Sequence, residues 1–452
     1  MARPGCSRCH PIAGRRRQSA SPGVPHRVCE RPLGGAVRRR HRIPAARRRV
    51  GNPVGANGLP QREPVVDRGP RRLGGGSGPR RGVGGVRIVV VGGGVAGLCA
   101  AWRARAQGAE VVLLEASSRL GGQILTEHVA DCLLEHGAEG FVAHSPALHE
   151  VCGRLGLATE VISQTVSRAL VAEDGVLREV PPGEAGRRLG IQARPADWGR
   201  GLQSLRRGMG SLVAALAAAI GQDRIRLTTP VEAVEPADGR PSGGWLVHSG
   251  AGTSFEADGV IVALPATAAG TVFQAVDPAA AHTLQRLGTV STLSVTLVVD
   301  KDHVRHPLDA TGIVVEDTAA PAGLRACSFA SSKWAGRAPS NRCVLRAFYR
   351  PPAGGVGDPE PWVERTQHYL ERIIGLKGDA LYTRVVSWPT AIPRYASDHE
   401  AVLAAALAPL QRLGRVALAG ASVARSGLDG AVRSGYAAAE AILQAGSRAP
   451  AQ

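Results

Sequence analysis

The sequence predicts an α/β fold in which a doubly wound parallel sheet is combined with a second, α+β domain. Three observations support this prediction. The apolar, β-branched run at 86–91 enters a glycine-rich turn and a helical stretch, a second apolar strand follows at 109–114, and a third strand and turn at 416–422 precede another helix. Short buried strands that alternate with helices are typical of parallel sheets covered on both faces.

Length and charge limit what surrounds this sheet. The 452 residues are enough for two or three ordinary domains. Residues 1–86 hold 20 Arg and three acidic residues, so they carry +17 of the net charge of +18 and leave the rest of the chain close to neutral. Because this Arg, Gly and Pro-rich tail has no periodic pattern, we expect residues 1–85 to be disordered, as well as 447–452. A basic face for nucleic acid is not expected on the folded body.

The cysteines and the hydropathy of the sequence indicate the cellular compartment of the protein. Five cysteines are scattered through the body without metal-ligand spacing, which suits a reducing compartment. No apolar stretch approaches the roughly 20 residues of a membrane-spanning helix. We therefore expect a cytoplasmic protein without a bound metal; peripheral contact with the inner membrane surface and assembly into a homodimer are left open.

The folded body begins with a dinucleotide-binding pattern. The first strand runs into Gly92-Gly93-Gly94-Val95-Ala96-Gly97, a G-x-G-x-x-G sequence, and then into a helical stretch at 98–107. Gly92 permits the tight turn, Gly94 lets the backbone approach a diphosphate, and Gly97 lets the helix pack closely on the strand. The diphosphate would lie at the helix N-terminus, where free N–H groups favour an anion.

The segment after the second strand distinguishes between cofactors. Glu115 ends that strand, and its carboxylate can accept hydrogen bonds from an adenosine ribose. Arg119 can neutralise diphosphate charge, and Gly121-Gly122 lets the backbone pass close to a ligand. This E-x-x-x-R-x-G-G sequence resembles the second element of the flavin amine oxidase superfamily, so we expect a Rossmann-like domain that binds FAD and not NAD.

Further motifs carry a resemblance that spans nearly everything from residue 86 to residue 443. The motifs are Leu134-Glu135-His136-Gly137-Ala138-Glu139-Gly140-Phe141, Arg207-Gly208-Met209-Gly210-Ser211-Leu212, the stretch from Ala326 to Trp334, and Trp388-Pro389-Thr390-Ala391-Ile392-Pro393-Arg394-Tyr395. Through them the chain is similar to the protoporphyrinogen and coproporphyrinogen oxidases within that superfamily. The family usually has glutamine where Arg394 stands and glycine where Asp398 stands.

The resemblance also implies where the cofactor binds. In flavin oxidases of this type the C-terminal helix, here opening at 427–432, points its N-terminus at the pyrimidine edge of the isoalloxazine, where negative charge gathers on reduction. A short strand at 231–234 reaches the adenine with its backbone. The predicted cofactor-binding residues are Gly92, Gly94, Val95, Ala96, Gly97, Glu115, Ala116, Arg119, Gly121, Gly122, Val231, Gly420, Gly427, Leu428 and Asp429.

The activity implied by the resemblance is the oxidation of a porphyrinogen, protoporphyrinogen IX or coproporphyrinogen III, in haem biosynthesis. Hydride would pass to the flavin N5, and dioxygen would reoxidise the flavin with release of hydrogen peroxide. Two cationic side chains are candidates for the catalytic site. Arg168 lies in a segment similar to the one where the family places an arginine against a substrate propionate, and Lys333 could stand near N5 through a water. An ordinary surface role is the alternative for each.

One departure from the family keeps other functions open. Between Arg119 and Met209 the chain is far shorter than in typical members, which place a helical substrate and membrane-docking subdomain there. We expect the FAD-binding domain to comprise 86–145, 200–270 and 385–446, and a discontinuous α+β substrate domain with an antiparallel sheet to comprise 146–199 and 271–384. The alternatives are another oxidase of the amine oxidase and carotene desaturase group, or a flavin-binding remnant without porphyrinogen activity.

Overall fold

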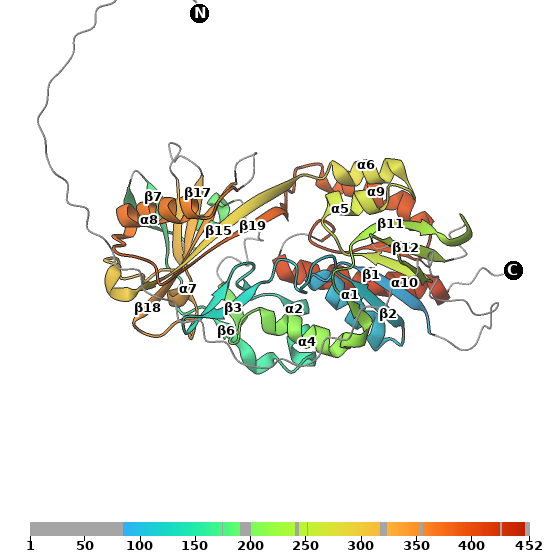
Figure 1. The fold of residues 1–452 in the computed structure, drawn as a ribbon, viewed down its shortest axis with the longest axis horizontal. Helices are drawn as coiled ribbons and strands as arrows, with labels where there is room; N and C mark the ends of the chain where they lie inside the picture. Colours follow the sequence, from blue (N-terminus) through green and yellow to red (C-terminus); the bar gives the residue numbers. More distant parts are fainter. Residues whose placement is uncertain are drawn as a thin grey trace, which may run out of the picture. The chain divides into compact units, whose positions relative to one another are not determined.

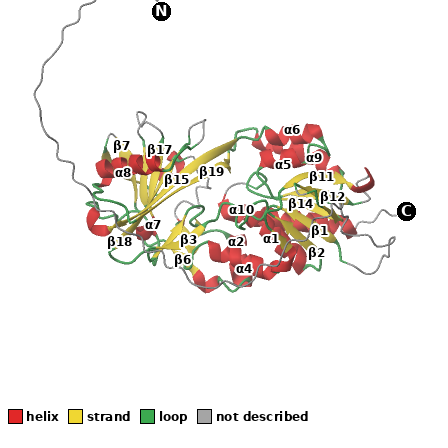
Figure 2. Ribbon diagram, in the orientation of Figure 1, coloured by secondary structure: helices red, strands yellow, loops and turns green. Residues whose placement is uncertain are grey.

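A computed structural model of the protein describes residues 85–447, apart from 174, 190–199, 240–243, 251, 317–322, 352–355 and 425–426. The tail at 1–84 and residues 448–452, for which we predict disorder, lie outside the described residues. The described chain forms two large sheets with helices packed on them (Figure 1, Figure 2). The predicted mixed α/β fold is confirmed.

The first large sheet is parallel throughout. Its central strand is apolar from Ile88 to Val91, and these residues are buried, as expected for a strand covered on both faces. Neighbouring strands pair in parallel on each side of it. The order across the sheet is β10 (Ile225–Arg226), β2 (Glu110–Leu114), β1 (Arg87–Val91), β14 (Gly259–Val262) and β20 (Val416–Leu418).

Both faces of the parallel sheet are covered, which is the doubly wound arrangement. One face packs against the helices α1 (Val95–Ala106), α2 (Pro146–Arg154), α4 (Gly210–Ile220) and α10 (Gly427–Ser447). The other face packs against an antiparallel sheet of β11 (Val231–Pro236), β12 (Trp245–Ser249) and β13 (Ser254–Ala257), with helices α5 (Ala266–Val272), α6 (Pro278–Gln285) and α9 (His399–Arg412). Two separate apolar cores result, one on each face.

The second large sheet is antiparallel except for the β16–β7 pair. Helix α8 (Glu360–Ile374) buries Trp362, Leu370 and Ile374 in the core of this sheet. In Figure 1 the long strands β15 and β19 run side by side from this sheet toward α6. The order is β19 (Tyr382–Pro393), β15 (Thr289–Asp300), β18 (Arg342–Tyr349), β17 (Leu324–Phe329), β16 (Gly312–Val315), β7 (Ala169–Glu173) and β8 (Val176–Val180).

Two irregularities interrupt the pairing of this sheet. Between β15 and β19, Val290 pairs with Ile392 but Thr292 pairs with Trp388, so the segment 389–391 bulges out. Proline at 389 cannot donate a ladder hydrogen bond, which favours a bulge at this point. A second shift lies between β17 and β18 and leaves Arg325 without a register partner. Bulges redirect side chains, and both of these lie next to the cavity described below.

The segment 134–141 joins the two large sheets. The Arg346 guanidinium donates to the carbonyl oxygens of His136 and Gly137, each at 2.6 Å, and the indole N–H of Trp388 donates to that of His136 at 2.9 Å. The elements around this junction are short. They are β3 (Thr126–Val129), β4 (Cys132–Glu135), β5 (Phe141–Val142), β6 (Val161–Ser163), β9 (Leu202–Leu205) and α7 (Ala330–Lys333). Helix α3 (Glu184–Arg188) instead packs on β7 and β16.

The domain boundaries given above stay a prediction. Strand β19 belongs to the antiparallel sheet although the predicted FAD-binding stretch already starts at residue 385, and α10 extends to Ser447.

No described helix combines the length and the apolar composition needed to cross a bilayer. Within the described part of the chain, no three His, Cys, Asp or Glu side chains gather in a way that could hold a metal ion.

Candidate active site

The loop between β1 and α1 contains the predicted diphosphate-binding glycines. Gly92 has a φ of +105°, and a Cβ there would lie 2.5 Å from the carbonyl oxygen of Ala263. A Cβ on Gly97 would lie 1.9 Å from the carbonyl oxygen of Gly92, so any larger residue would force the helix away from the strand. Gly94 differs, because its Cβ would meet only the Cα of Gly122, at 4.0 Å. The loop therefore presents bare backbone to open space at Gly94.

Helix α1 begins directly after this loop. Its first turn contains Val95, Ala96 and Gly97, holds no acidic residue, and is not capped by a side chain. Backbone N–H groups in the first turn of a helix have no partner within the helix, and the helix dipole adds positive potential there. The N-terminus of α1 can therefore bind an anionic group at the place where the sequence predicts the diphosphate.

Glu115 lies beside the same loop. Its Oε2 accepts a hydrogen bond from the backbone N–H of Gly93 at 2.6 Å, and Ala116 next to it is exposed. The N–H of Thr229 donates to the Glu115 carbonyl oxygen at 2.9 Å, which brings the chain leading to Val231, the first residue of β11, alongside. A carboxylate has about four acceptor positions, so Glu115 can bind the loop and still accept ribose hydroxyl groups.

Arg119 turns back onto its own loop. Its guanidinium donates to the carbonyl oxygens of Leu120, Gly122 and Ile124 at 3.1, 2.7 and 2.9 Å. The N–H of Gly121 donates to the carbonyl oxygen of Gly93, in the first glycine-rich loop, at 2.8 Å. Burial lowers the pKa of Arg119. In this structure Arg119 thus holds the 119–124 loop in shape where the two glycine loops meet, and its charge lies at that junction.

The C-terminal part of the predicted site lies against the N-terminal part. A Cβ on Gly435 of α10 would lie 2.3 Å from the carbonyl oxygen of Ala96, so α10 and α1 touch at backbone distance. The N–H of Gly420, in the turn after β20, donates to Ser434 Oγ at 2.9 Å and ties that turn to α10. The structure therefore brings together two segments that are more than 300 residues apart in the sequence.

The side chain of Asp429 has a different role from the one its position in the motif suggests. Its Oδ1 accepts hydrogen bonds from the N–H groups of Ala147 and Leu148 at 2.9 and 3.2 Å, at the start of α2, and its Oδ2 pairs with Arg433 at 3.0 Å. The carboxylate thus caps α2. The backbone of residues 427–429, including Gly427 and Leu428, is what the first turn of α10 offers to a cofactor.

These residues fit FAD. The backbones of Gly94 and Gly122 lie against each other, since a Cβ on Gly122 would lie 3.1 Å from the Gly94 Cα, and the uncapped N-terminus of α1 beside them suits a diphosphate. Glu115 is placed beside that loop for the ribose, and the start of α10 lies on the other side, against α1. These groups therefore match a ligand that has an anionic diphosphate in its middle and an uncharged group on each side of it, as FAD has.

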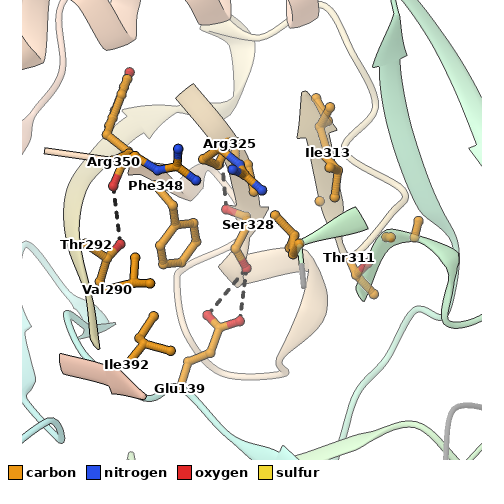
Figure 3. Close-up of a pocket in the computed structure, with 18 of the residues that line it drawn as sticks. Glu139, Val290, Thr292, Thr311, Ile313, Arg325, Ser328, Phe348, Arg350 and Ile392 are labelled. Atoms are coloured by element: carbon orange, nitrogen blue, oxygen red, sulfur yellow. Dashed lines mark hydrogen bonds between the residues drawn. The ribbon is translucent and has the colours of Figure 1, made fainter. Parts of the chain in front are cut away.

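A cavity of about 690 Å³ lies on the seven-stranded sheet (Figure 3). The chain that forms its wall is hydrogen-bonded to two turns of the predicted cofactor site, those that follow Gly122 and Gly420. Gln123 Nε2 donates to the Ala391 carbonyl oxygen at 2.5 Å, and the Tyr395 hydroxyl donates to the Ala421 carbonyl oxygen at 2.7 Å. Apolar lining residues include Val290, Ile313, Ala326, Phe348, Ile392 and Pro393.

Lys333 lines this cavity together with Glu139. Lys333 Nζ lies 2.5 Å from Glu139 Oε1, and the Ser328 hydroxyl donates to the same oxygen at 3.1 Å. Burial would raise the pKa of Glu139, but Lys333 and Arg346 outweigh burial and the pKa lies below its ordinary value. Glu139 is therefore ionised at neutral pH and holds the Lys333 ammonium at one end of the cavity.

The structure does not bring the Arg168 side chain into the cavity. It is 43% exposed, its Nε lies 2.9 Å from Glu179 Oε2, and it is also paired with Asp309. Only the backbone of this segment reaches the lining, through the neighbouring Ala169 and through Thr311, whose N–H donates to the Arg168 carbonyl oxygen at 2.8 Å. A contact of Arg168 with a substrate carboxylate stays a prediction.

Three other arginines, which are not among the predicted site residues, line the cavity. Arg325 lies at the bulge in β17, and Arg350 and Arg394 directly follow the last residues of β18 and β19. Glu139 also belongs to the lining. The available signal in the sequence was Arg394, which stands where the family usually has glutamine. Nothing local to Arg325 or Arg350 marks them in so Arg-rich a chain.

Comparison with known proteins gives matches along the chain. A family model described as flavin containing amine oxidoreductase matches residues 184–443, and one described as an NAD(P)-binding Rossmann-like domain matches residues 90–155. The coproporphyrinogen III oxidase of Mycobacterium bovis is 24% identical over 450 residues, which cover 79% of this chain and 97% of that protein. That of Propionibacterium freudenreichii is 39% identical over 97 residues, 21% of this chain and 18% of that protein.

A solved structure has the same fold. The crystal structure of an Exiguobacterium protein assigned as a protoporphyrinogen oxidase superposes with a TM-score of 0.68 at 22% identity, over 79% of this chain and 99% of that one. The resemblance stated from the sequence is thus confirmed, and the first family match spans more than half of the chain. This protein belongs to the flavin containing amine oxidoreductase family and is an oxidoreductase that binds FAD.

Proposed function

We propose that the protein oxidises a porphyrinogen, protoporphyrinogen IX or coproporphyrinogen III, with dioxygen as the electron acceptor. The observation that carries this proposal is the 690 Å³ cavity, whose wall is bonded to the turns next to Gly121 and Gly420. Cavities of this volume hold organic ligands of substantial size, and Phe348 and Ile313 offer apolar contacts. The similarity to coproporphyrinogen III oxidases supports the same substrate class.

The roles of the chain's own residues follow from this position. FAD, when bound, supplies the redox chemistry by accepting hydride from the substrate and passing electrons to dioxygen, which leaves as hydrogen peroxide. The N-terminus of α10 contributes positive potential beside the cofactor site. Lys333, fixed by Glu139, holds an ammonium group at the inner end of the cavity and orients the polar part of the substrate. The apolar walls exclude water from the reacting ring.

The charge of the cavity favours a porphyrinogen over the amine substrates that the family name suggests. Its described lining carries the cations Arg325, Arg350, Arg394 and Lys333, against the single carboxylate of Glu139, which is already paired. A protonated amine would be repelled by this excess of positive charge, whereas a substrate with carboxylate groups would be attracted.

An oxygen-electrode assay tests the proposal. Purified protein saturated with FAD is offered protoporphyrinogen IX, coproporphyrinogen III and a panel of amines, and oxygen uptake, peroxide and porphyrin fluorescence are recorded. We expect turnover with a porphyrinogen and none with the amines. The variant Gly97→Ala, which should not hold FAD, measures spontaneous porphyrinogen oxidation. Turnover with an amine alone would refute the proposal, and yellow protein inactive on every compound would support a flavin-binding remnant.

A further inference from the structure

We infer that Arg325, Arg350 and Arg394 form a carboxylate-recognition set that makes the cavity select a ring substrate with carboxylate groups along more than one edge. This inference rests on the proposed function, because it names the feature by which the same cavity would discriminate between porphyrinogens. We infer that this set, and not Arg168, which the resemblance to the family suggests, binds the substrate carboxylates.

The sheet places the three arginines at different levels along the cavity. Tyr349 pairs with both Leu324 and Leu293, and because the strands are antiparallel, Arg325 and Arg350 lie on opposite sides of that level. Arg394 follows Pro393, whose partner on β15 is Thr289, four residues before Leu293. At about 3.3 Å per residue, Arg394 is offset from Arg350 by roughly 13 Å along β15, and Arg325 lies still farther from it.

The three guanidinium groups are available to a ligand. Among the residues that the structure describes, none of the three is paired with an acidic side chain, whereas Arg168 is paired with two. Arg325 Nη2 donates one long hydrogen bond, 3.4 Å, to the Arg188 carbonyl oxygen. Arg350 and Arg394 are exposed, so no desolvation cost opposes their charge before a ligand arrives.

The lining between the charges is mostly apolar, and the Ser328 hydroxyl within it is bonded to Glu139. In Figure 3 Arg325 and Arg350 lie at the upper edge, Glu139 lies at the lower edge, and the Phe348 ring and Val290 lie between them. A tetrapyrrole macrocycle would cover the apolar middle, and its peripheral carboxylates would reach the arginines on two sides. Forked guanidinium groups suit this recognition because each can donate two parallel hydrogen bonds to a carboxylate.

Substrate choice follows from the number of carboxylates. Coproporphyrinogen III carries four propionates, and protoporphyrinogen IX carries two, both on one side of the ring. Arginines separated along β15 can bind propionates on two edges only in the tetracarboxylate. The cavity should therefore favour coproporphyrinogen III.

Binding and turnover together test this inference. Fluorescence titration of the FAD-loaded protein with coproporphyrin III, its tetramethyl ester and protoporphyrin IX measures recognition without chemistry. The variants are Arg325→Gln, Arg350→Gln and Arg394→Gln, with Arg168→Gln as the competing site and Arg178→Gln, an exposed arginine outside the lining, as the control. Retained flavin absorbance shows that each variant is folded.

We expect wild-type protein to bind coproporphyrin III most tightly, and each cavity variant to bind it about tenfold more weakly, the loss expected for one charged hydrogen-bonding group at a half-exposed site. Binding of the ester should not change, and kcat/KM should lose its preference for coproporphyrinogen III. Unchanged binding in the three variants, or a loss confined to Arg168→Gln, would overturn the inference.

The binding and turnover measurements distinguish a failure of this inference from a failure of the proposed function. If a porphyrinogen is oxidised but the three variants match wild type, the inference fails and the function stands. If the variants weaken coproporphyrin III binding but no porphyrinogen is oxidised, carboxylate recognition stands and the proposed reaction fails.

Discussion

Glu135 is a buried carboxyl group whose titration should make the stability of this protein depend on pH. It ends β4 and is 6% exposed. Its Oε1 accepts from the Met209 N–H at 2.6 Å and its Oε2 from the Thr126 hydroxyl at 2.8 Å. Burial raises the pKa of Glu135 to about 7, although these two hydrogen bonds and the charges of Arg337 and Arg346 act in the opposite direction.

The sign and size of the effect follow from the two pKa values. Because the pKa in the folded state exceeds the ordinary value of 4.5, the folded protein keeps a proton that the unfolded chain releases. The stabilisation is complete below pH 4.5 and is lost as the pH rises through 7. At about 1.4 kcal/mol for each pKa unit, the loss is roughly 3 kcal/mol in the free energy of unfolding. Glu135→Gln keeps the shape and removes the titration.

Urea unfolding at pH 5 and pH 8 measures this difference. We expect wild-type protein to lose roughly 2.5 kcal/mol more than Glu135→Gln between the two pH values, since pH 5 lies slightly above the pKa of 4.5 in the unfolded chain. Glu110→Gln, at an exposed position on β2, is the matched control and should behave like wild type. Groups that titrate in all three proteins cancel in the comparison. An equal loss in wild type and Glu135→Gln would refute the reasoning.

Two further predictions concern the cofactor site and the cavity. Gly97→Ala should yield protein without flavin absorbance, because its Cβ would lie 1.9 Å from a backbone carbonyl oxygen; Gly153→Ala, where a Cβ meets nothing within 4 Å, should stay yellow. Lys333→Met should lower kcat and reduce the free energy of unfolding by about 3 kcal/mol, since Glu139 is left buried without its partner. The double variant Lys333→Met with Glu139→Gln should recover the stability but not the activity. Spectra after incubation with FAD check the first, and unfolding curves with turnover numbers check the second.

The first part of the fold could be predicted from the sequence because local residues determine it. The apolar run of β1, the glycines at 92–97 and the strand that ends at Glu115 each need only their neighbours to define a turn or an element. The sequence predicts the helix at 98–107, whereas α1 is Val95–Ala106. The small residues at 95–97 fit both a diphosphate-binding turn and the first turn of a helix, so the local pattern does not fix where the helix begins.

Other features depend on pairings that no local pattern contains. Asp429 caps α2 through residues 281 and 282 positions away, and Arg168 is paired with Asp309, 141 positions away. The positions of Arg325 and Arg350 beside one cavity follow from a strand register and a bulge. The partner of a charged side chain depends on which strands are paired, so its role follows from the structure and not from the sequence motif alone.

The cofactor site couples the two ends of the described chain. The spacing between α1 and α10 is set by backbone contact at Gly435 and Ala96, where no side chain can yield, and Gly420 is tied to α10 through Ser434. A ligand that touches both the loop at 92–97 and the start of α10 can bind only when these contacts are in place. FAD therefore binds the folded state and not the unfolded chain, and its binding free energy adds to the stability of the fold according to its concentration relative to its Kd. The glycines of this site thus serve folding and cofactor binding through the same close contacts.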